Sequence, residues 1–300
     1  MAPGGCSPSS KYNIMLAVEV DVMFKVLEKD LLAENIYRMV VEAPLVAAKA
    51  QAGNFVMVRV SDVGERIPLT ICDHDAERGT LTLIIQAVGK STRDLVNIQV
   101  GDMVKDVLGP LGTATEIGDA ERIIAVMGGI GVAPMLPLLR AYRKKGAEIV
   151  SILGARTKDL LILQEEVKSL SDEVILVTDD GSYGIKGLVT DPLRERLQKG
   201  ETYDLAIAIG PARMMQAACN VTKEYDLPTL VSLNSIMIDG TGMCGGCRVT
   251  INGETKFTCV DGPDFDGHAV NFDELVVRQG YYRDEEEYSH KCQSFGGEQV

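Results

Sequence analysis

Tryptophan is absent from this 300-residue sequence, and aromatic residues make up only 5% of it. Valine, isoleucine, alanine and glycine are plentiful instead, which suits parallel sheets joined to helices by tight turns. No stretch approaches eighteen uninterrupted apolar residues, so the sequence predicts no membrane-spanning helix. Basic residues are also scarce: 30 Lys and Arg face 43 Asp and Glu, and the net charge of −13 argues against nucleic acid and against an anionic membrane surface as partners.

The cysteines indicate a reducing compartment. Their number, seven, is odd, three of them lie in one metal-like pattern, and no signal-peptide layout of basic, apolar and small-residue regions opens the chain. These features predict a cytoplasmic protein.

The length predicts two or three domains, in a multi-domain chain of α/β and β type. Residues 1–22 are predicted to be an N-terminal extension, partly disordered because its first part is rich in Gly, Pro and Ser. Residues 23–118 carry short, regularly spaced apolar segments, which predict an antiparallel β-barrel. In residues 119–227 strands alternate with helices, one of them expected at about residues 159–170, which predicts a parallel sheet. Residues 228–300 hold a cysteine-rich module and an acidic tail, with a hairpin predicted around Asn252-Gly253 and a loop over residues 262–268.

Two motifs in the predicted barrel could contact a phosphate group. The first, Arg66-Ile67-Pro68-Leu69-Thr70, places a guanidinium beside a rigid proline and a hydroxyl. The second, Gly89-Lys90-Ser91-Thr92, combines a glycine turn with paired hydroxyls and opens a helical turn whose backbone N–H groups could hold phosphate. An ordinary surface turn is the simpler interpretation of each motif taken alone.

Four loops follow the predicted parallel strands, at the edge where such sheets bind ligands. Loop 128–134, with the sequence Gly-Gly-Ile-Gly-Val-Ala-Pro, presents N–H groups and a helix dipole to a pyrophosphate, although it departs from the G-x-G-x-x-G fingerprint. Loop 154–157 offers a guanidinium, loop 179–184 offers carboxylates for ribose hydroxyls, and loop 210–215 completes the edge. Together they predict a dinucleotide site with these candidate contacts: Gly128, Gly129, Gly131, Pro134, Asp179, Gly210 and Met214.

A third pattern predicts a metal centre near the C-terminus. Cys244 and Cys247 are separated by two residues, and Cys259 follows after eleven more. The plant-type ferredoxin spacing C-x₄-C-x₂-C is reproduced with Asp239 at the first position, and nearby glycines let backbone N–H groups approach sulfur. The pattern therefore predicts a cluster held by three Cys and one Asp, with a zinc knuckle or an inert C-x-x-C as the alternative.

The order of these motifs resembles the ferredoxin-NADP reductase superfamily over residues 23–226. The C-terminal cysteine module narrows the resemblance to electron-transfer subunits related to that of dihydroorotate dehydrogenase B. The run MIDGTGMCGGCRVT, with its Asp, and the later FTCVDGPDFDGHAVNFDE resemble the small (alpha) subunits of NADH-dependent reduced ferredoxin:NADP oxidoreductases.

The resemblance implies roles for the barrel motifs in binding FAD. Leu69 and Thr70, next to Pro68, would line the flavin, and Arg66 would neutralise the pyrophosphate. The ribityl and pyrophosphate region would be held by Gly89, Ser91 and Thr92. One departure concerns Arg66: many superfamily members have R-x-Y-[ST], with the Arg three residues before the hydroxyl, whereas Arg66 lies four residues before Thr70.

The resemblance also implies a nucleotide, a cluster and a partner. Loop 128–134 would hold the nicotinamide nucleotide, with Gly210 and Met214 beneath the nicotinamide, and NAD(H) is favoured over NADP(H). NAD(H) would exchange a hydride with FAD, and FAD would exchange single electrons with a [2Fe–2S] cluster. A large partner subunit with further flavin and [4Fe–4S] clusters would react with ferredoxin and NADP(H), in a complex that could bifurcate electrons.

Two other functions stay open. The chain could be the electron-transfer subunit of a dihydroorotate dehydrogenase or of a hydrogenase-linked diaphorase, which would send the electrons to a different partner. It could also be a zinc-stabilised scaffold that binds nucleotide without turnover.

Overall fold

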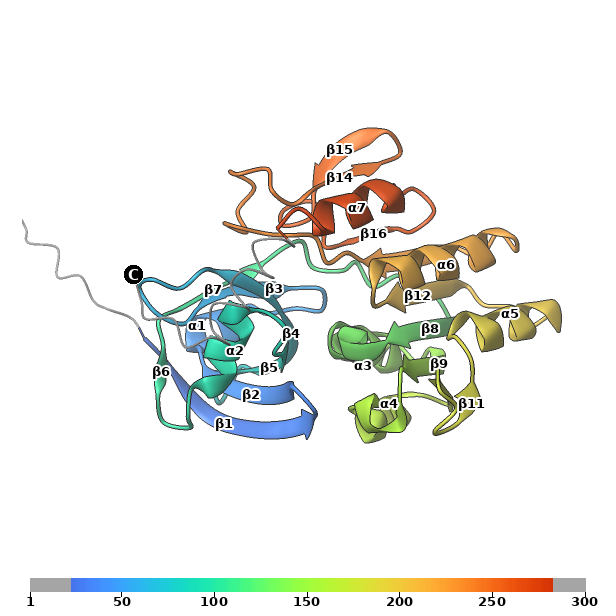
Figure 1. Cartoon of the computed structure of the whole chain (residues 1–300). Helices are drawn as coiled ribbons and strands as arrows, with labels where there is room; N and C mark the ends of the chain where they lie inside the picture. The colour runs from blue at the N-terminus through green and yellow to red at the C-terminus, as the bar shows by residue number, and fades with distance from the viewer. Residues whose placement is uncertain (1–22, 283–300) are drawn as a thin grey trace, which may run out of the picture.

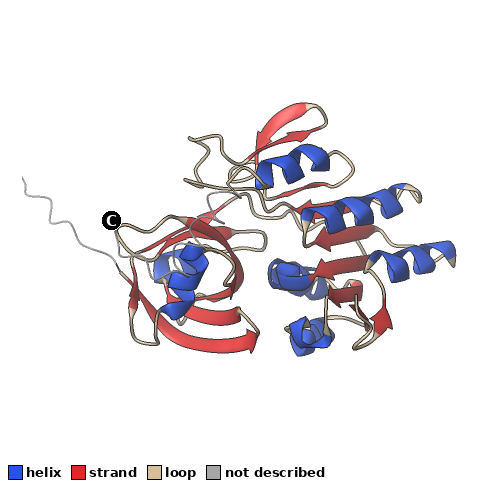
Figure 2. Cartoon of the chain, viewed as in Figure 1, coloured by secondary structure: helices blue, strands red, loops and turns tan. Residues whose placement is uncertain are grey.

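The computed structural model describes residues 23–282, and the predicted extension at residues 1–22 and the end of the acidic tail lie outside them. Figure 1 shows a strand-rich unit on one side, a sheet flanked by helices on the other, and the C-terminal hairpin and last helix above both. Figure 2 shows how strongly the helices are concentrated around the second sheet. Within residues 23–282 no helix is both long and apolar enough to cross a membrane.

The first unit is a seven-stranded antiparallel sheet in the order β6-β1-β2-β5-β4-β3-β7. Its strands are β1 (Phe24–Ala33), β2 (Ile36–Glu42), β3 (Phe55–Arg59), β4 (Ile67–Asp75), β5 (Thr80–Gln86), β6 (Met103–Val104) and β7 (Asp106–Leu111). Alternate residues of β5, namely Leu81, Leu83 and Ile85, are fully buried inside the barrel, as the two-residue period of a strand requires. Two short helices, α1 (Pro44–Ala47) and α2 (Lys90–Asn97), complete the unit. The predicted antiparallel barrel is confirmed.

The second unit is a mostly parallel sheet in the order β11-β10-β9-β8-β12-β13-β16. Its strands are β8 (Arg122–Gly128), β9 (Glu148–Ala155), β10 (Glu173–Thr178), β11 (Ile185–Lys186), β12 (Leu205–Ile209), β13 (Thr229–Ser232) and β16 (Asp264–Asp266). The helices are η1 (Gly129–Gly131), α3 (Val132–Lys144), η2 (Lys158–Leu160), α4 (Gln164–Leu170), α5 (Thr190–Gln198) and α6 (Ala212–Lys223).

Both faces of this sheet are buried, which explains why β8 reads as a continuous apolar run. Ile124 and Val126 pack toward the face covered by α5 and α6, whereas Ile123 and Ala125 pack toward the face covered by α3 and α4. The predicted parallel sheet with flanking helices is confirmed.

One helix starts later than the sequence suggests. A helix is expected from about residue 159, but the chain forms only the short turn η2 there, and α4 begins at Gln164. Leu161 and Ile162 are buried in the core in an extended segment, and Leu163 then adopts a left-handed backbone conformation, with φ of 55°, to enter the helix. Core burial therefore overrides helix propensity in this segment.

The C-terminal part forms a hairpin and a helix, and it also returns to the parallel sheet. The hairpin of β14 (Arg248–Ile251) and β15 (Glu254–Phe257) turns at Asn252 and Gly253, both with positive φ as the predicted tight turn requires, and α7 (Phe272–Gln279) follows. A loop is expected over residues 262–268, but Asp264–Asp266 forms β16, which pairs antiparallel with β13. The segment that carries the hairpin and the cysteines thus leaves the parallel sheet after β13 and returns to it as β16.

Asp264 connects all three parts of the molecule. Its Oδ2 accepts a hydrogen bond from Thr115 Oγ1, in the segment that links the two sheets, and its backbone pairs with Ser232 of β13. Thr115 N in turn donates to Ala52 O of the barrel, at 2.9 Å. The carboxyl is buried, its Oδ1 has no hydrogen-bond partner among residues 23–282, and burial raises its pKa.

The raised pKa of Asp264 predicts a pH-dependent stability. The native state keeps the Asp264 proton to a higher pH than the unfolded chain does, because the pKa of an Asp in the unfolded chain is about 3.9. Asp264 therefore contributes most to stability at low pH, and this contribution falls as the pH rises through the raised pKa. Asp264→Asn cannot ionise, so urea unfolding between pH 4 and pH 8 should show the free energy of unfolding moving in favour of this variant as pH rises.

The control is Asp264→Ala, which also cannot ionise but leaves the Thr115 hydroxyl without its partner, so it should be less stable than Asp264→Asn by about 1–3 kcal/mol at every pH. If the wild type gains stability relative to Asp264→Asn as pH rises, Asp264 is ionised in the native state and the assignment is wrong.

Candidate functional site

The first predicted motif lies on strand β4 and at its entry. Pro68, Leu69 and Thr70 pair with Met57, Val56 and Phe55 of β3, respectively. Arg66 stands just before the strand, and its Nη2 is 3.1 Å from Asp106 Oδ2, which Arg59 also binds at 2.6 Å. One carboxylate therefore faces two guanidiniums, so a positive charge remains for an anionic ligand.

The second predicted motif caps helix α2. Thr92 Oγ1 accepts hydrogen bonds from the N–H groups of Val88 and Gly89, both at 3.0 Å, so this hydroxyl is committed to the helix start. Ser91 Oγ donates to Glu65 Oε2 at 3.3 Å, which places the helix start beside the residue that precedes Arg66. The space that a side chain on Gly89 would occupy is open. The two motifs therefore lie together at an open helix N-terminus, whose backbone N–H groups and dipole suit a phosphate group.

The predicted dinucleotide loops come together at the carboxyl ends of β8 and β12. The chain runs outward from β8 through β9 and β10, then crosses to β12 on the other side, so these loops flank the switch point of the sheet. A Cβ on Gly131 would lie 2.3 Å from Ile209 O, and one on Gly128 would lie 2.4 Å from Met214 Sδ. The glycines thus allow α3 to start against the loop at Gly210, with the Met214 side chain beneath.

Two further members of this loop have different surroundings. Gly129 has a positive φ of 56° and open space where a Cβ would stand, so its backbone is accessible. Pro134 lies in the first turn of α3, where the missing N–H leaves no helical hydrogen bond unmade.

Asp179 lies at the same sheet edge, after β10, and is exposed. The neighbouring loops are tied to each other: Asp180 N donates to Arg156 O at 3.2 Å, and Lys158 N donates to Ser182 Oγ at 2.8 Å. Hydrogen bonds from Ser182 lower the pKa of Asp180. The edge therefore presents two carboxylates and the basic residues of loop 154–158 side by side.

Helix α3 connects the nucleotide loop to the flavin strand. Arg140 Nη1 donates to Cys72 O of β4 at 3.0 Å, and its Nη2 lies 3.3 Å from Asp73 Oδ2. Cys72 is buried in the same apolar cluster as α3, and burial raises the pKa of its thiol to about 12. Cys72 therefore packs as an inert thiol, and the predicted FAD and nucleotide motifs are neighbours.

The cysteines lie on the cluster loop (residues 239–247) and at the end of the hairpin. Cys247 Sγ and Cys259 Sγ are 3.2 Å apart and both residues are buried, whereas Cys244 is exposed. Burial, together with the neighbouring Cys247, raises the pKa of Cys259. Two sulfurs at this separation can serve one metal centre, because binding a metal displaces the thiol protons.

The Asp239 carboxylate binds backbone N–H groups of the cluster loop. Its Oδ1 accepts from Thr241 N and its Oδ2 from Cys244 N, both at 2.7 Å, and these hydrogen bonds lower its pKa. Within residues 23–282 the structure does not bring three or more His, Cys, Asp or Glu side chains close enough to hold a metal. Two pairs of the four candidate ligands are therefore in contact: Cys247 with Cys259 through their sulfurs, and Asp239 with Cys244 through the Cys244 backbone N–H.

The cluster loop packs directly on the barrel. Phe55 and Met57 of β3 form one apolar cluster with Cys247 and Cys259. A Cβ on Gly240 would lie 2.6 Å from Met57 Cγ, so the loop approaches the strand closely. Because Phe55 pairs with Thr70, the sulfurs lie one strand away from the predicted flavin residues.

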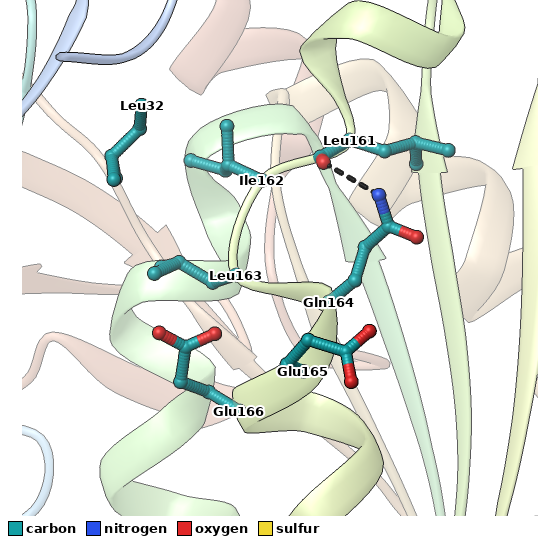
Figure 3. Close-up of a pocket in the computed structure, with 7 residues that line it drawn as sticks. All are labelled: Leu32, Leu161, Ile162, Leu163, Gln164, Glu165 and Glu166. Carbon is teal, nitrogen blue, oxygen red and sulfur yellow. Dashed lines mark hydrogen bonds between the residues drawn. The ribbon is translucent and has the colours of Figure 1, made fainter.

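Two pockets lie outside these motifs. The first, of about 320 Å³, lies where Leu32 of the barrel faces the start of α4, with Ile162, Leu163 and the carboxylates of Glu165 and Glu166 around it (Figure 3). The second, of about 520 Å³, lies at the opposite edge of the parallel sheet from the nucleotide loops. No motif signals either pocket, because the first needs Leu32 of the barrel opposite residues 161–166, and the second is lined by residues from 205, 223–230 and 266–268. The same holds for contacts of the site that the motifs missed: Phe55, Met57, Glu65, Asp106 and Arg140.

Gly131→Ala tests the close approach of α3 to the loop at Gly210. The added Cβ would meet the backbone oxygen of Ile209, which cannot move away, so we expect a loss of about 1–3 kcal/mol in the free energy of unfolding. The start of α3 would also shift, and NADH binding should weaken by about tenfold or more, equivalent to about 1.4 kcal/mol. Gly118→Ala, where the space is open, is the matched control. Wild-type NADH affinity in Gly131→Ala would remove this loop from the nucleotide site.

Comparison with known proteins agrees with this arrangement. Residues 234–271 match the iron–sulfur cluster binding domain of dihydroorotate dehydrogenase B, and residues 125–220 match the oxidoreductase NAD-binding domain. An uncharacterized protein of Clostridium beijerinckii is 48% identical over 88% of this chain and 92% of its own length. A Thermotoga maritima homolog of the dihydroorotate dehydrogenase B (NAD(+)) electron transfer subunit is 43% identical, over 89% of this chain and 94% of its own.

A solved structure of an NADH-dependent reduced ferredoxin-NADP oxidoreductase contains a chain that superposes with a TM-score of 0.85, at 41% identity, over 90% of this chain and 97% of that one. The predicted family and fold class are confirmed. The chain belongs to the family of electron-transfer oxidoreductase subunits related to that of dihydroorotate dehydrogenase B, with a ferredoxin reductase-like fold, an NAD-binding domain and a C-terminal iron–sulfur cluster-binding domain.

Proposed function

We propose that this subunit exchanges electrons with NAD(H) at the carboxyl edge of the parallel sheet and passes them, through FAD and a [2Fe–2S] cluster, to a partner subunit. The observation that carries the proposal is a continuous line of contacts. Helix α3 starts at the nucleotide loop and contacts β4 through Arg140 and Cys72, β4 pairs with β3, and Phe55 of β3 packs on Cys247. Direct contacts therefore link the proposed nucleotide, flavin and cluster residues in series.

The residues of the nucleotide edge would bind and orient the dinucleotide. The N-terminus of α3, which follows the accessible backbone of Gly129, offers N–H groups and a partial positive charge to the pyrophosphate. Met214, packed under Gly128 and Gly210, would support the nicotinamide ring from below. Arg140 would hold the β4 strand at a fixed distance from α3, so that the two rings face each other.

The residues of the barrel would hold FAD, with its diphosphate at Arg66 and the start of α2 and its ring along β4. Bound FAD supplies the link between a two-electron donor and a one-electron acceptor. Asp239, Cys244, Cys247 and Cys259 are the proposed cluster ligands. A carboxylate has about four lone-pair positions, so Asp239 can accept its two backbone hydrogen bonds and still offer an oxygen to iron.

The acidic edge supports NAD(H) as the nucleotide. Asp179 and Asp180 would accept hydrogen bonds from ribose hydroxyls but would repel an added phosphate. Arg156 and Lys158 lie nearby, so the preference rests on the balance of charge at this edge.

A partner subunit is expected, because the Thermotoga relative is named as an electron transfer subunit. Beyond the three cysteines of the cluster site the chain has four others, of which Cys72 and Cys219 are buried on different elements of the described structure. Among residues 23–282, the cysteines outside the cluster site therefore do not supply a [4Fe–4S] site. We therefore propose a large subunit carrying further flavin and [4Fe–4S] clusters, at which ferredoxin and NADP(H) react, in a cytoplasmic complex.

Dihydroorotate dehydrogenase is the second candidate, because the cluster-binding region matches that of dihydroorotate dehydrogenase B. The two functions differ in the partner and share the chemistry of this chain. Co-purification of the chain from its own cells, followed by identification of the bound subunit, would separate them.

Absorption spectroscopy of the purified chain tests the proposed function directly. We expect flavin and about two irons per chain, and we expect NADH to bleach the flavin band anaerobically because the nucleotide and flavin residues adjoin. NADPH is the matched control and should act more slowly. Zinc without flavin or iron would instead establish the scaffold alternative.

Replacing Asp239 tests the proposed ligand set. In Asp239→Cys a thiolate would replace the carboxylate oxygen, so the midpoint potential and the electron paramagnetic resonance (EPR) spectrum of the cluster should change. The loss of two backbone hydrogen bonds should also destabilise the cluster loop by about 1–3 kcal/mol in all. Asp239→Asn, which keeps an acceptor oxygen, separates the two effects. An unchanged potential and spectrum in Asp239→Cys would show that Asp239 is not a ligand.

A further inference from the structure

Two arginines bind backbone carbonyl groups of the cluster loop. Arg248, at the start of β14, donates from Nη1 to Gly245 O at 3.1 Å, and Arg278 of α7 donates from Nη2 to Gly246 O at 3.0 Å. The backbone N–H of Arg248 also points at Gly245 O, at 3.4 Å, which closes a turn over Cys247. Successive carbonyls of the ligand loop are thus each held by a cation.

The Gly245 carbonyl belongs to the same peptide group as the Gly246 N–H. That N–H donates to Cys244 Sγ at 3.4 Å. The guanidinium of Arg248, the Gly245–Gly246 peptide and the Cys244 sulfur therefore form a hydrogen-bonded chain in which each member polarises the next. A cation at the carbonyl end strengthens the N–H as a donor to sulfur.

Neither of these two arginines forms an ion pair with a carboxylate within residues 23–282, although most other arginines of the described chain do. Arg278 lies over the ring of Tyr281, with 5.3 Å from its Cζ to the ring centre, and is half-buried. Within the described residues, two arginines without an ion-pair partner thus bind one loop of a chain whose net charge is −13.

Cys244 is the sulfur at which a polarised N–H donor has the most effect. Cys247 and Cys259 are buried, whereas Cys244 is exposed, so water competes for hydrogen bonds to its sulfur. An N–H fixed by a turn and polarised by a guanidinium keeps one such bond in place. Hydrogen bonds to cluster sulfurs and nearby positive charge both favour the reduced, more negative state of an iron–sulfur centre.

We propose that Arg248, acting through the Gly245–Gly246 peptide, is a positioning residue that raises the reduction potential of the centre held at Cys244, and that Arg278 reinforces it at the next peptide. The proposal rests on the proposed function, because it requires a cluster at these cysteines. Arg248 would not touch the cluster itself. It would set the direction and the polarity of the Gly246 N–H group, which donates to Cys244 Sγ.

Arg248→Gln tests the proposal in the full-length protein. Iron and flavin content are measured first, because a wild-type chain without a cluster refutes the proposed function rather than this inference. The midpoint potential is then followed by the EPR signal of the reduced cluster. We expect a more negative potential in Arg248→Gln, an intermediate one in Arg248→Lys, which keeps the charge but not the planar fork, and a more negative one in Arg278→Gln.

Arg194→Gln is the matched control. It removes the same charge from α5, where Arg194 pairs with Glu224 rather than with the cluster loop, and it should leave the potential unchanged. If Arg248→Gln fails to retain the cluster, Arg248→Lys and Arg278→Gln carry the test.

The ionic strength separates the peptide route from a simple surface charge. At about 1 M salt the Debye length is about 3 Å, so a potential shift caused only by an exposed charge would vanish, whereas a shift carried by the hydrogen-bonded peptide would remain. A potential that is the same in Arg248→Gln and the wild type, or a difference that disappears in high salt, would overturn the proposal.

Discussion

Strand β3 is the element on which the arrangement of the site depends, because its two sides serve different neighbours. Along one edge it pairs with β4, so that Phe55 lies opposite Thr70, and its Phe55 and Met57 side chains pack against Cys247 and Cys259. A strand that is buried on the cysteine side and hydrogen-bonded on the flavin side cannot shift its register without moving both. The separation between the two proposed redox groups is therefore set by the spacing of the sheet.

The glycines of the nucleotide loop impose a second constraint of the same kind. Gly128 and Gly131 allow side chains and backbone from the β12 loop to approach to distances that any Cβ would prevent. Helix α3 then runs from this loop to the barrel, where Arg140 binds β4. Two glycines thus fix where α3 begins, and α3 in turn fixes the position of the parallel sheet relative to the barrel.

The sequence predicts those parts of the structure whose signals are local. Alternating apolar residues predict the barrel strands, buried apolar runs predict the parallel strands, and Asn252-Gly253 predicts the hairpin. Glycine and cysteine spacing likewise identify loop 128–134 and the cluster loop. The start of α4 is mispredicted because the burial of Leu161 and Ile162 is decided by the core. The pairing of Arg66 with Asp106 and the strand β16 join segments far apart in the chain, and no local pattern encodes them.

The return of the chain as β16 has a mechanical consequence for electron exit. The segment that carries the cysteines leaves the parallel sheet after β13 and re-enters it at β16, so it is anchored at both ends rather than tethered by one. A carrier domain on a single linker can swing between donor and acceptor, whereas a loop clamped twice has no such freedom of rotation. The proposed exit point therefore stays in place, and a proposed electron acceptor would have to dock where the cluster loop already is.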